Sequence, residues 1–167
     1  MSAIKYTFAY YYISPDHAEK LTAFQEASGD ARNTLINQFV RGWIGRNRET
    51  YRSLARFDAE KRDISYRQWG EIIVNQGVEA LPSYKEEIGD IPDNPLKNVV
   101  LGSELIKHPI NYIWLGVENI AFLKIAIHYD RDTNIGFISR IVKEHLDRNW
   151  DTLYAPQVAA DNFENWI

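Results

Sequence analysis

Apolar side chains recur at helical spacing along most of this chain, and polar residues typical of helix caps precede several of the stripes. Ser14 followed by Pro15 is typical of a helix start, and Gly29 of a helix end. A second stripe, over residues 35–44, predicts the next helix, which either continues to residue 55 or breaks near Asn47.

Further helices are predicted along the rest of the chain. Ser65 stands three residues before Gln68, which is the spacing of a capping box. Two prolines make Asp90–Pro95 the clearest loop. By the same rules we expect helices over residues 65–77, 83–89, 95–106, 109–129 and 135–155.

The first segment departs from helical periodicity. Residues 6–13 read YTFAYYYI, and aromatic residues favour extended structure. The alternating residues Tyr6, Phe8, Tyr10 and Tyr12 would lie on one side of an extended arm. We expect that side to pack across the protein's own core, or else to insert into a neighbouring subunit.

These patterns together predict an all-α fold. It would be a single-domain bundle of six or seven helices over residues 1–167, with a short extended aromatic N-terminal arm. The loop at 90–95 would serve as a hinge between lobes 14–89 and 95–167.

Composition adds little beyond an ordinary globular protein. Hydrophobic residues make up 45% of the chain, and cysteine is absent, which excludes disulfides and fits a reducing cytoplasm. The most apolar window, Ile113–Ile127, contains Glu118 and Lys124 and is too short and too charged to span a bilayer. We therefore expect a cytoplasmic protein with no membrane partner.

Charge is distributed unevenly. Residues 32–67 hold nine of the 19 Lys and Arg residues and only four acidic residues, while the whole chain carries a net charge of −4. A basic segment in an acidic protein indicates a local anionic partner. Trp43 and Tyr66 stand among these arginines, and the combination suits phosphate contacts with base stacking, or a protein interface.

Four of the arginines would share one face of a continuous helix, opposite its apolar side. We call this set the arginine ribbon: Arg41, Arg48, Arg52 and Arg56. The planar guanidinium forks suit phosphate oxygens. The alternative is a solvated charged face with intrahelical ion pairs. The predicted nucleic-acid-binding residues are the ribbon together with Arg62, Arg67, Trp43, Tyr66 and Gln68.

Residues 58–72 also resemble part of a helix-turn-helix motif. Ala59 stands where the first helix needs a small residue, and Tyr66, Arg67 and Gln68 would begin the recognition helix. The pattern fails at positions 58 and 62, which should be buried but are Asp and Arg, and at Asp63, where glycine is usual.

Catalytic patterns are sparse. None of the four histidines lies in a HExxH or ExxH arrangement, and the chain has no P-loop, GxGxxG or GxSxG motif. His145 continues an apolar stripe and is interpreted as a core residue. We therefore expect no catalytic residues, no metal and no cofactor.

The sequence is thus most consistent with a non-enzymatic, nucleic-acid-associated helical protein. It would be a regulator or a small subunit of a nucleoprotein assembly, and would contact the phosphates of DNA or RNA through the arginine-rich face. The alternative is a structural or adaptor subunit whose basic face docks an acidic protein. Either protein would fit a homo-oligomer or a larger complex.

Overall fold

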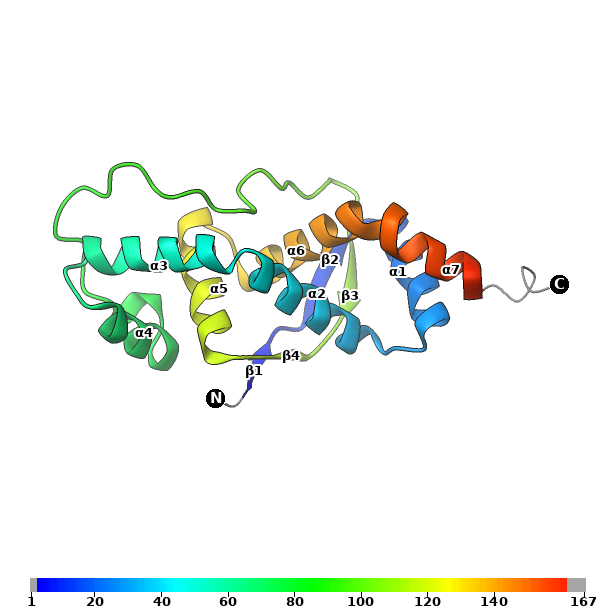
Figure 1. Cartoon of the computed structure of the whole chain (residues 1–167), viewed down its shortest axis with the longest axis horizontal. Coiled ribbons are helices and arrows are strands. Elements are labelled where there is room, and N and C mark those ends of the chain that lie inside the picture. Colours follow the sequence, from blue (N-terminus) through cyan, green and yellow to red (C-terminus); the bar gives the residue numbers. More distant parts are fainter. Residues whose placement is uncertain (1–2, 162–167) are drawn as a thin grey trace. The chain divides into compact units, whose positions relative to one another are not determined.

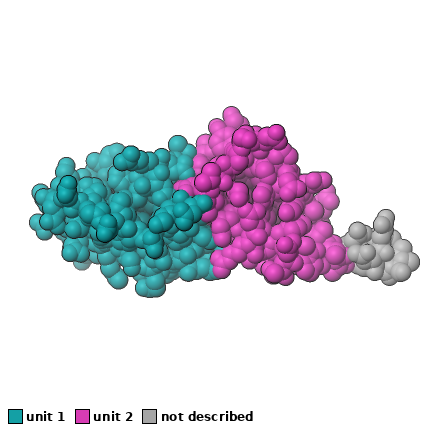
Figure 2. All heavy atoms as spheres, turned by 90° about the horizontal axis from the view of Figure 1, so that it is seen from above, with its two compact units in different colours: residues 1–6, 41–98, 114–133 teal, residues 7–40, 99–113, 134–167 magenta. Residues whose placement is uncertain are grey.

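The computed structural model describes residues 3–161 and divides the chain into two compact units (Figures 1 and 2). Among the described residues, unit 1 contains residues 3–6, 41–98 and 114–133, and unit 2 contains residues 7–40, 99–113 and 134–161. Each unit is assembled from three separate segments. The single-domain organisation with a hinge at 90–95 stays a prediction.

Unit 1 is built on three helices that pack against one another: α3 (Arg48–Lys61), α4 (Tyr66–Asn75) and α5 (Val117–Asp130) (Figure 1). Tyr51 of α3 stacks on Phe122 of α5, with 6.0 Å between ring centroids. Trp69 and Ile73 are buried on the inner face of α4. A 3₁₀ turn, Val78–Ala80, follows α4, and a long irregular segment then runs to residue 98.

Unit 2 contains further helices and the strand pair β2–β3. Its elements are α1 (Pro15–Ser28), most of α2 (Arg32–Arg46), β2 (Tyr10–Ile13), β3 (Ile106–Pro109), α6 (Asn134–Asn149), a π-helical turn (Trp150–Tyr154) and α7 (Ala155–Asp161). The buried Ser139 of α6 accepts a 2.7 Å hydrogen bond from the Tyr12 backbone N–H of β2. Phe39 of α2 stacks on His145 of α6 at 4.1 Å.

The predicted all-α class is wrong, because the fold contains two antiparallel two-stranded sheets. About 61% of the chain is helical and 10% is strand, so the protein is mixed α and β. β2 pairs with β3, with Tyr10 opposite Pro109 and Ile13 opposite Ile106. The second pair joins β1 (Ile4–Thr7) to β4 (Tyr112–Leu115).

Local signals located several helix boundaries correctly. Ser14 caps α1, and Gly29 ends it in the left-handed conformation with φ 75°. Both bonds of the capping box between Ser65 and Gln68 are present. The chain breaks between α2 and α3 at Asn47, which was one of the two expected outcomes.

Two predicted helices do not form, and two others form with different bounds. Residues 83–89 are irregular, and the Lys85 backbone N–H bonds to the last turn of α3 at Lys61. Residues 95–106 form a turn, a loop and the start of β3, while β4 occupies part of the helix expected from residue 109. Pro156 does not end the last helix, because it lies in the first turn of α7, where proline is tolerated.

The aromatic arm pairs with its own chain, and its buried side agrees with the prediction at Tyr6 and Phe8 but not at Tyr10 and Tyr12. Tyr6 and Phe8 are buried, whereas Tyr11 and Ile13 point inward in the next strand. Tyr10 and Tyr12 are half-buried and meet edge to face. The alternation changes phase because the segment forms two short strands, β1 and β2, rather than one.

The alternating burial along β2 predicts that truncating two neighbouring tyrosines lowers the stability of the protein by different amounts. Tyr11 is fully buried and bonds through its hydroxyl to His108 Nδ1 at 2.9 Å, so Tyr11→Ala should reduce the free energy of unfolding by about 3 kcal/mol or more. Tyr12→Ala should cost less than about 1 kcal/mol, because its ring is only half-buried. Urea unfolding followed by circular dichroism measures both. Equal losses would contradict the observed register.

Candidate nucleic-acid interface

The α3–turn–α4 segment of unit 1 brings together most of the predicted site residues. Four residues, 62–65, connect the two helices. Ser65 Oγ accepts the backbone N–H of Gln68 at 3.1 Å, and Gln68 Oε1 accepts the backbone N–H of Ser65 at 3.0 Å. This reciprocal pair satisfies two of the donors that a helix start leaves free, so α4 begins at a defined residue.

A buried carboxylate holds this segment in place. Asp58 is 0% exposed, and its Oδ2 accepts hydrogen bonds from Arg62 Nε at 2.8 Å and Trp69 Nε1 at 2.9 Å. Its Oδ1 accepts from the hydroxyls of Tyr84 at 2.6 Å and Tyr129 at 2.7 Å. Four donors therefore satisfy the carboxylate, and they come from the turn after α3, from α4, from the irregular segment and from α5.

The phenols around Asp58 remain protonated donors at neutral pH. Burial, together with the hydrogen bond to Asp58, raises the pKa of Tyr84, and burial raises the pKa of Tyr129 further. The adjacent His128 has a lowered pKa, chiefly from burial and then from the positive charge of Arg62. The cluster therefore contains one ion pair, Asp58 with Arg62, surrounded by neutral groups.

Asp58, Arg62 and Asp63 depart from a helix-turn-helix pattern in the sequence, but in the structure they have the burial and the backbone conformation that the motif requires. Asp58 and Arg62 are both buried, because each is the other's partner. Asp63 takes the left-handed conformation, with φ 59°, that glycine usually supplies in the turn. Ala59 is buried where a small residue is needed. A four-residue turn between packed helices is typical of this motif.

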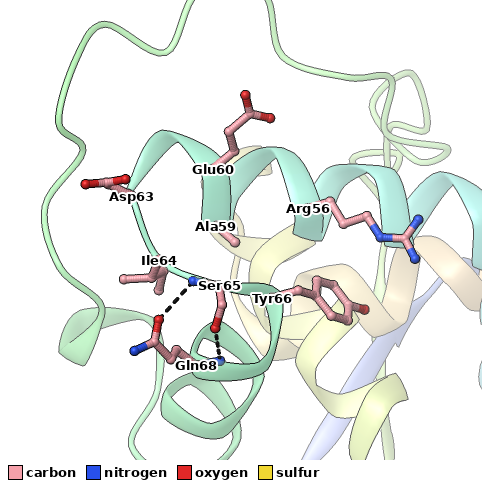
Figure 3. Close-up of a pocket in the computed structure, with 8 residues that line it drawn as sticks. All are labelled: Arg56, Ala59, Glu60, Asp63, Ile64, Ser65, Tyr66 and Gln68. Carbon is pink, nitrogen blue, oxygen red and sulfur yellow. Dashed lines mark hydrogen bonds between the residues drawn. The ribbon is translucent and has the colours of Figure 1, made fainter.

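A hollow of about 450 Å³ lies beside the turn, and Figure 3 shows the side chains that line it. Arg56 and Glu60 line it from α3, Asp63 from the turn, and Tyr66 and Gln68 from α4. The guanidinium of Arg56 lies over the Tyr66 ring at 5.5 Å. The hollow has charges of both signs, so it does not form a uniformly basic anion site.

The outer face of α4 is polar. Arg67, Gln68, Glu71 and Asn75 are exposed, whereas Trp69 and Ile73 face the core. Arg67 is 88% exposed and bonds to Glu71 at 3.1 Å, an exposed i,i+4 pair of little energetic weight. Two predicted site residues, Arg67 and Gln68, thus lie together at the start of an accessible helix.

The arginine ribbon is divided by the break at Asn47 and by ion pairs. Arg48 and Arg52 both bond to Glu118 of α5, and Arg52 also bonds to Glu49 at 3.0 Å. Both side chains are only about one-third exposed. The sequence pattern did not reveal this pairing, because Glu118 lies in an otherwise apolar stretch far along the chain.

The other predicted cations fall into two groups. Arg62 is 5% exposed, and each of its three guanidinium nitrogens donates one hydrogen bond, to Asp58, to the Pro82 carbonyl and to Tyr84. Arg41 and Arg56 are exposed, and neither forms an ion pair within residues 3–161, nor does Arg46.

The predicted aromatic contacts differ in accessibility. Trp43 is buried and donates its indole N–H to Tyr51 at 3.0 Å, so its ring is not offered to a base. Tyr66 is half-buried and stacks on Trp69, with 5.8 Å between centroids. Burial raises the pKa of Tyr66, with Glu118 adding to the effect. Its hydroxyl therefore stays neutral.

Unit 2 holds a chain of hydrogen bonds with the residue types of a hydrolase triad. Ser14 Oγ lies 2.6 Å from His17 Nδ1, and His17 Nε2 lies 2.5 Å from Asp147. The same serine oxygen accepts the His17 backbone N–H and caps α1, and Lys143 shares the half-exposed Asp147. These bonds fasten α1 to α6 and do not free the serine as a nucleophile.

The buried histidine of α6 has a structural role. His145 is buried and bonds to the Tyr154 hydroxyl at 2.5 Å, as expected for a core histidine. Within the described part of the chain, no three His, Asp or Glu side chains are placed to share a metal ion.

No helix among residues 3–161 has the length and apolar character needed to cross a bilayer. The chain matches no family model, no curated protein and no solved structure.

The Asp58 cluster predicts a large effect of a small substitution. Asp58→Asn would turn an amide N–H₂ toward two of the four donors and leave Arg62 buried without a counter-charge. We expect the free energy of unfolding to fall by about 3 kcal/mol or more.

The matched control is Asp63→Asn, which removes the same charge at an exposed position whose left-handed backbone asparagine also adopts. Its effect should stay within about 0.5 kcal/mol. Urea unfolding of both variants is the measurement. A tolerated Asp58→Asn would mean that the cluster does not support unit 1.

Proposed function

We propose that this protein is a non-enzymatic, nucleic-acid-associated protein that contacts phosphates through the exposed arginines of unit 1. Arg41, Arg46, Arg56 and Arg67 are the cations we assign to this role. Arg62 and Trp43 are left out because they are buried, and Arg48 and Arg52 because acidic partners already neutralise them.

The observation that carries the proposal is the outward face of the α3–turn–α4 segment. The segment is fixed from inside by Asp58, while Arg56, Arg67 and Gln68 remain exposed on the outside. A rigid support beneath solvated cations suits phosphate binding, because little side-chain and backbone freedom is then lost on association.

The net negative charge of the chain lowers the affinity of this surface for nucleic acid of arbitrary sequence. The net charge is −4, and Glu60 and Asp63 border the same hollow as Arg56. We therefore infer a regulator or a small subunit of an assembly rather than a general nucleic-acid coat. The absence of cysteine leads us to assign it to the cytoplasm.

A second candidate is an adaptor subunit that docks an acidic protein through the same arginines. An apolar hollow of about 420 Å³ between α4 and α5 favours it. Ile4, Trp69, Val74 and Phe122 line the hollow, and so does Arg67. An acidic segment carrying an apolar anchor would suit this combination.

Salt dependence of binding tests the primary proposal. Affinity for labelled random-sequence oligonucleotides should fall with salt, and the double variant Arg41→Ala with Arg56→Ala should flatten the log–log slope by about 2. Fluorescence anisotropy at several salt concentrations gives the slope.

The control removes two positive charges elsewhere in unit 1, at the exposed Lys85 and Lys97. That variant should keep the slope of the original protein. If neither variant changes the slope, or the protein binds no oligonucleotide even at low salt, the proposal is overturned. Binding to polyglutamate in place of oligonucleotides would favour the adaptor.

A further inference from the structure

We propose that the partner is double-stranded DNA, that α4 enters its major groove, and that the side-chain amide of Gln68 reads an acceptor on a base edge. The inference rests on the proposed function and names its ligand class. It assigns the backbone contacts to arginines and the base contact to Gln68.

The width of a helix such as α4 and the position of α4 after α3 favour a double-stranded ligand. An α-helix with side chains is about 10–12 Å wide, and the major groove of B-DNA is about 12 Å wide. In a helix-turn-helix arrangement the first residues of the second helix reach the bases, and the first helix crosses the backbone. Arg67 and Gln68 are the exposed residues at the start of α4, and Arg56 is exposed on α3.

The aromatic residues of the two helices argue against a single strand. Single-stranded ligands are bound largely by stacking their bases on accessible aromatic rings. Trp69 is buried, and Tyr66 has Trp69 beneath its ring and Arg56 over it. Phe57 of α3 is half-buried and has Lys61 over its ring. The outer surfaces of α3 and α4 thus offer polar groups and no open stacking platform.

Gln68 is held in one orientation before any ligand arrives. Its Oε1 is fixed by the Ser65 backbone N–H at 3.0 Å, so the amide plane is set by the cap. Its Nε2 makes no hydrogen bond within residues 3–161, and Figure 3 shows it pointing away from Ser65. Two N–H donors are therefore presented to solvent, and the major-groove acceptors are purine N7, guanine O6 and thymine O4.

Arg67 provides a second donor group beside the amide. Its Nε bonds to Glu71, which steadies the side chain along the helix and leaves the terminal nitrogens of an 88% exposed guanidinium available. Those nitrogens can contact guanine or a neighbouring phosphate. The two adjacent side chains therefore predict a preference that includes a purine.

The capping box permits a substitution that removes the reading group and keeps the fold. Gln68→Glu retains an oxygen for the Ser65 N–H, and a carboxylate near a helix start is favourable, so the melting temperature should not fall. The two amide donors disappear. Ser65→Ala is the complementary variant, because it weakens the cap and leaves the Gln68 amide and its bond to the Ser65 backbone position in place.

Selection of bound sequences from a random duplex library, with the full chain, is the experiment. The original protein should enrich a short duplex motif and bind it at least tenfold more tightly than the matching single strand. Gln68→Glu should lose about tenfold in preference at one base pair. Its added negative charge lowers the affinity for all sequences alike and therefore leaves the preference at the other base pairs unchanged. Ser65→Ala should keep the same motif despite a lower melting temperature.

The possible failures point to different conclusions. If no nucleic acid binds, the proposed function itself is lost. If the single strand binds as tightly as the duplex, or if Gln68→Glu selects the same motif with the same preference, nucleic-acid binding stands and the role of Gln68 in a major groove is overturned. Loss of the motif in Ser65→Ala alone would assign the preference to helix stability and would also overturn the inference.

Discussion

The carboxylate of Asp58 is the group on which unit 1 depends. It accepts hydrogen bonds from four side chains: Arg62 lies one helical turn away, and Trp69, Tyr84 and Tyr129 lie farther along the chain. A buried charge without such partners would be strongly destabilising, so burial and hydrogen bonding must occur together. The helices and the irregular segment are thereby required to fold as one set, and α4 has a fixed place on α3.

The arginines of unit 1 fall into two groups, those that form ion pairs with acidic side chains of the unit and those that remain exposed. Arg62 serves the core, and Arg48 and Arg52 fasten α3 to Glu118 of α5. Arg56 and Arg67 remain on the outside, beside a helix start whose own cap orients Gln68. A surface of mixed sign with a few well-held donors favours recognition of one ligand over general attraction to anions.

Features set by neighbouring residues could be predicted from the sequence, and features set by distant pairing could not. The cap at Ser65 and the end of α1 at Gly29 follow from contacts within a few residues. β3 could not be distinguished from a helix, because its pairing with β2 joins residues almost one hundred positions apart. Asp58 looked like a flaw in a helix-turn-helix pattern for the same reason, since Tyr84 and Tyr129 lie far along the chain.

Backbone amide chemical shifts, recorded as a selected duplex is added to the ¹⁵N-labelled protein, test the central claim most directly. If the outer face of α4 is the binding surface, the largest changes should fall on residues 56–75, and the β2 and β3 amides of unit 2 should keep their positions. Changes centred on unit 2, or on α5 beside the apolar hollow with α4 unaffected, would contradict the assignment of α4 as the helix that reads DNA.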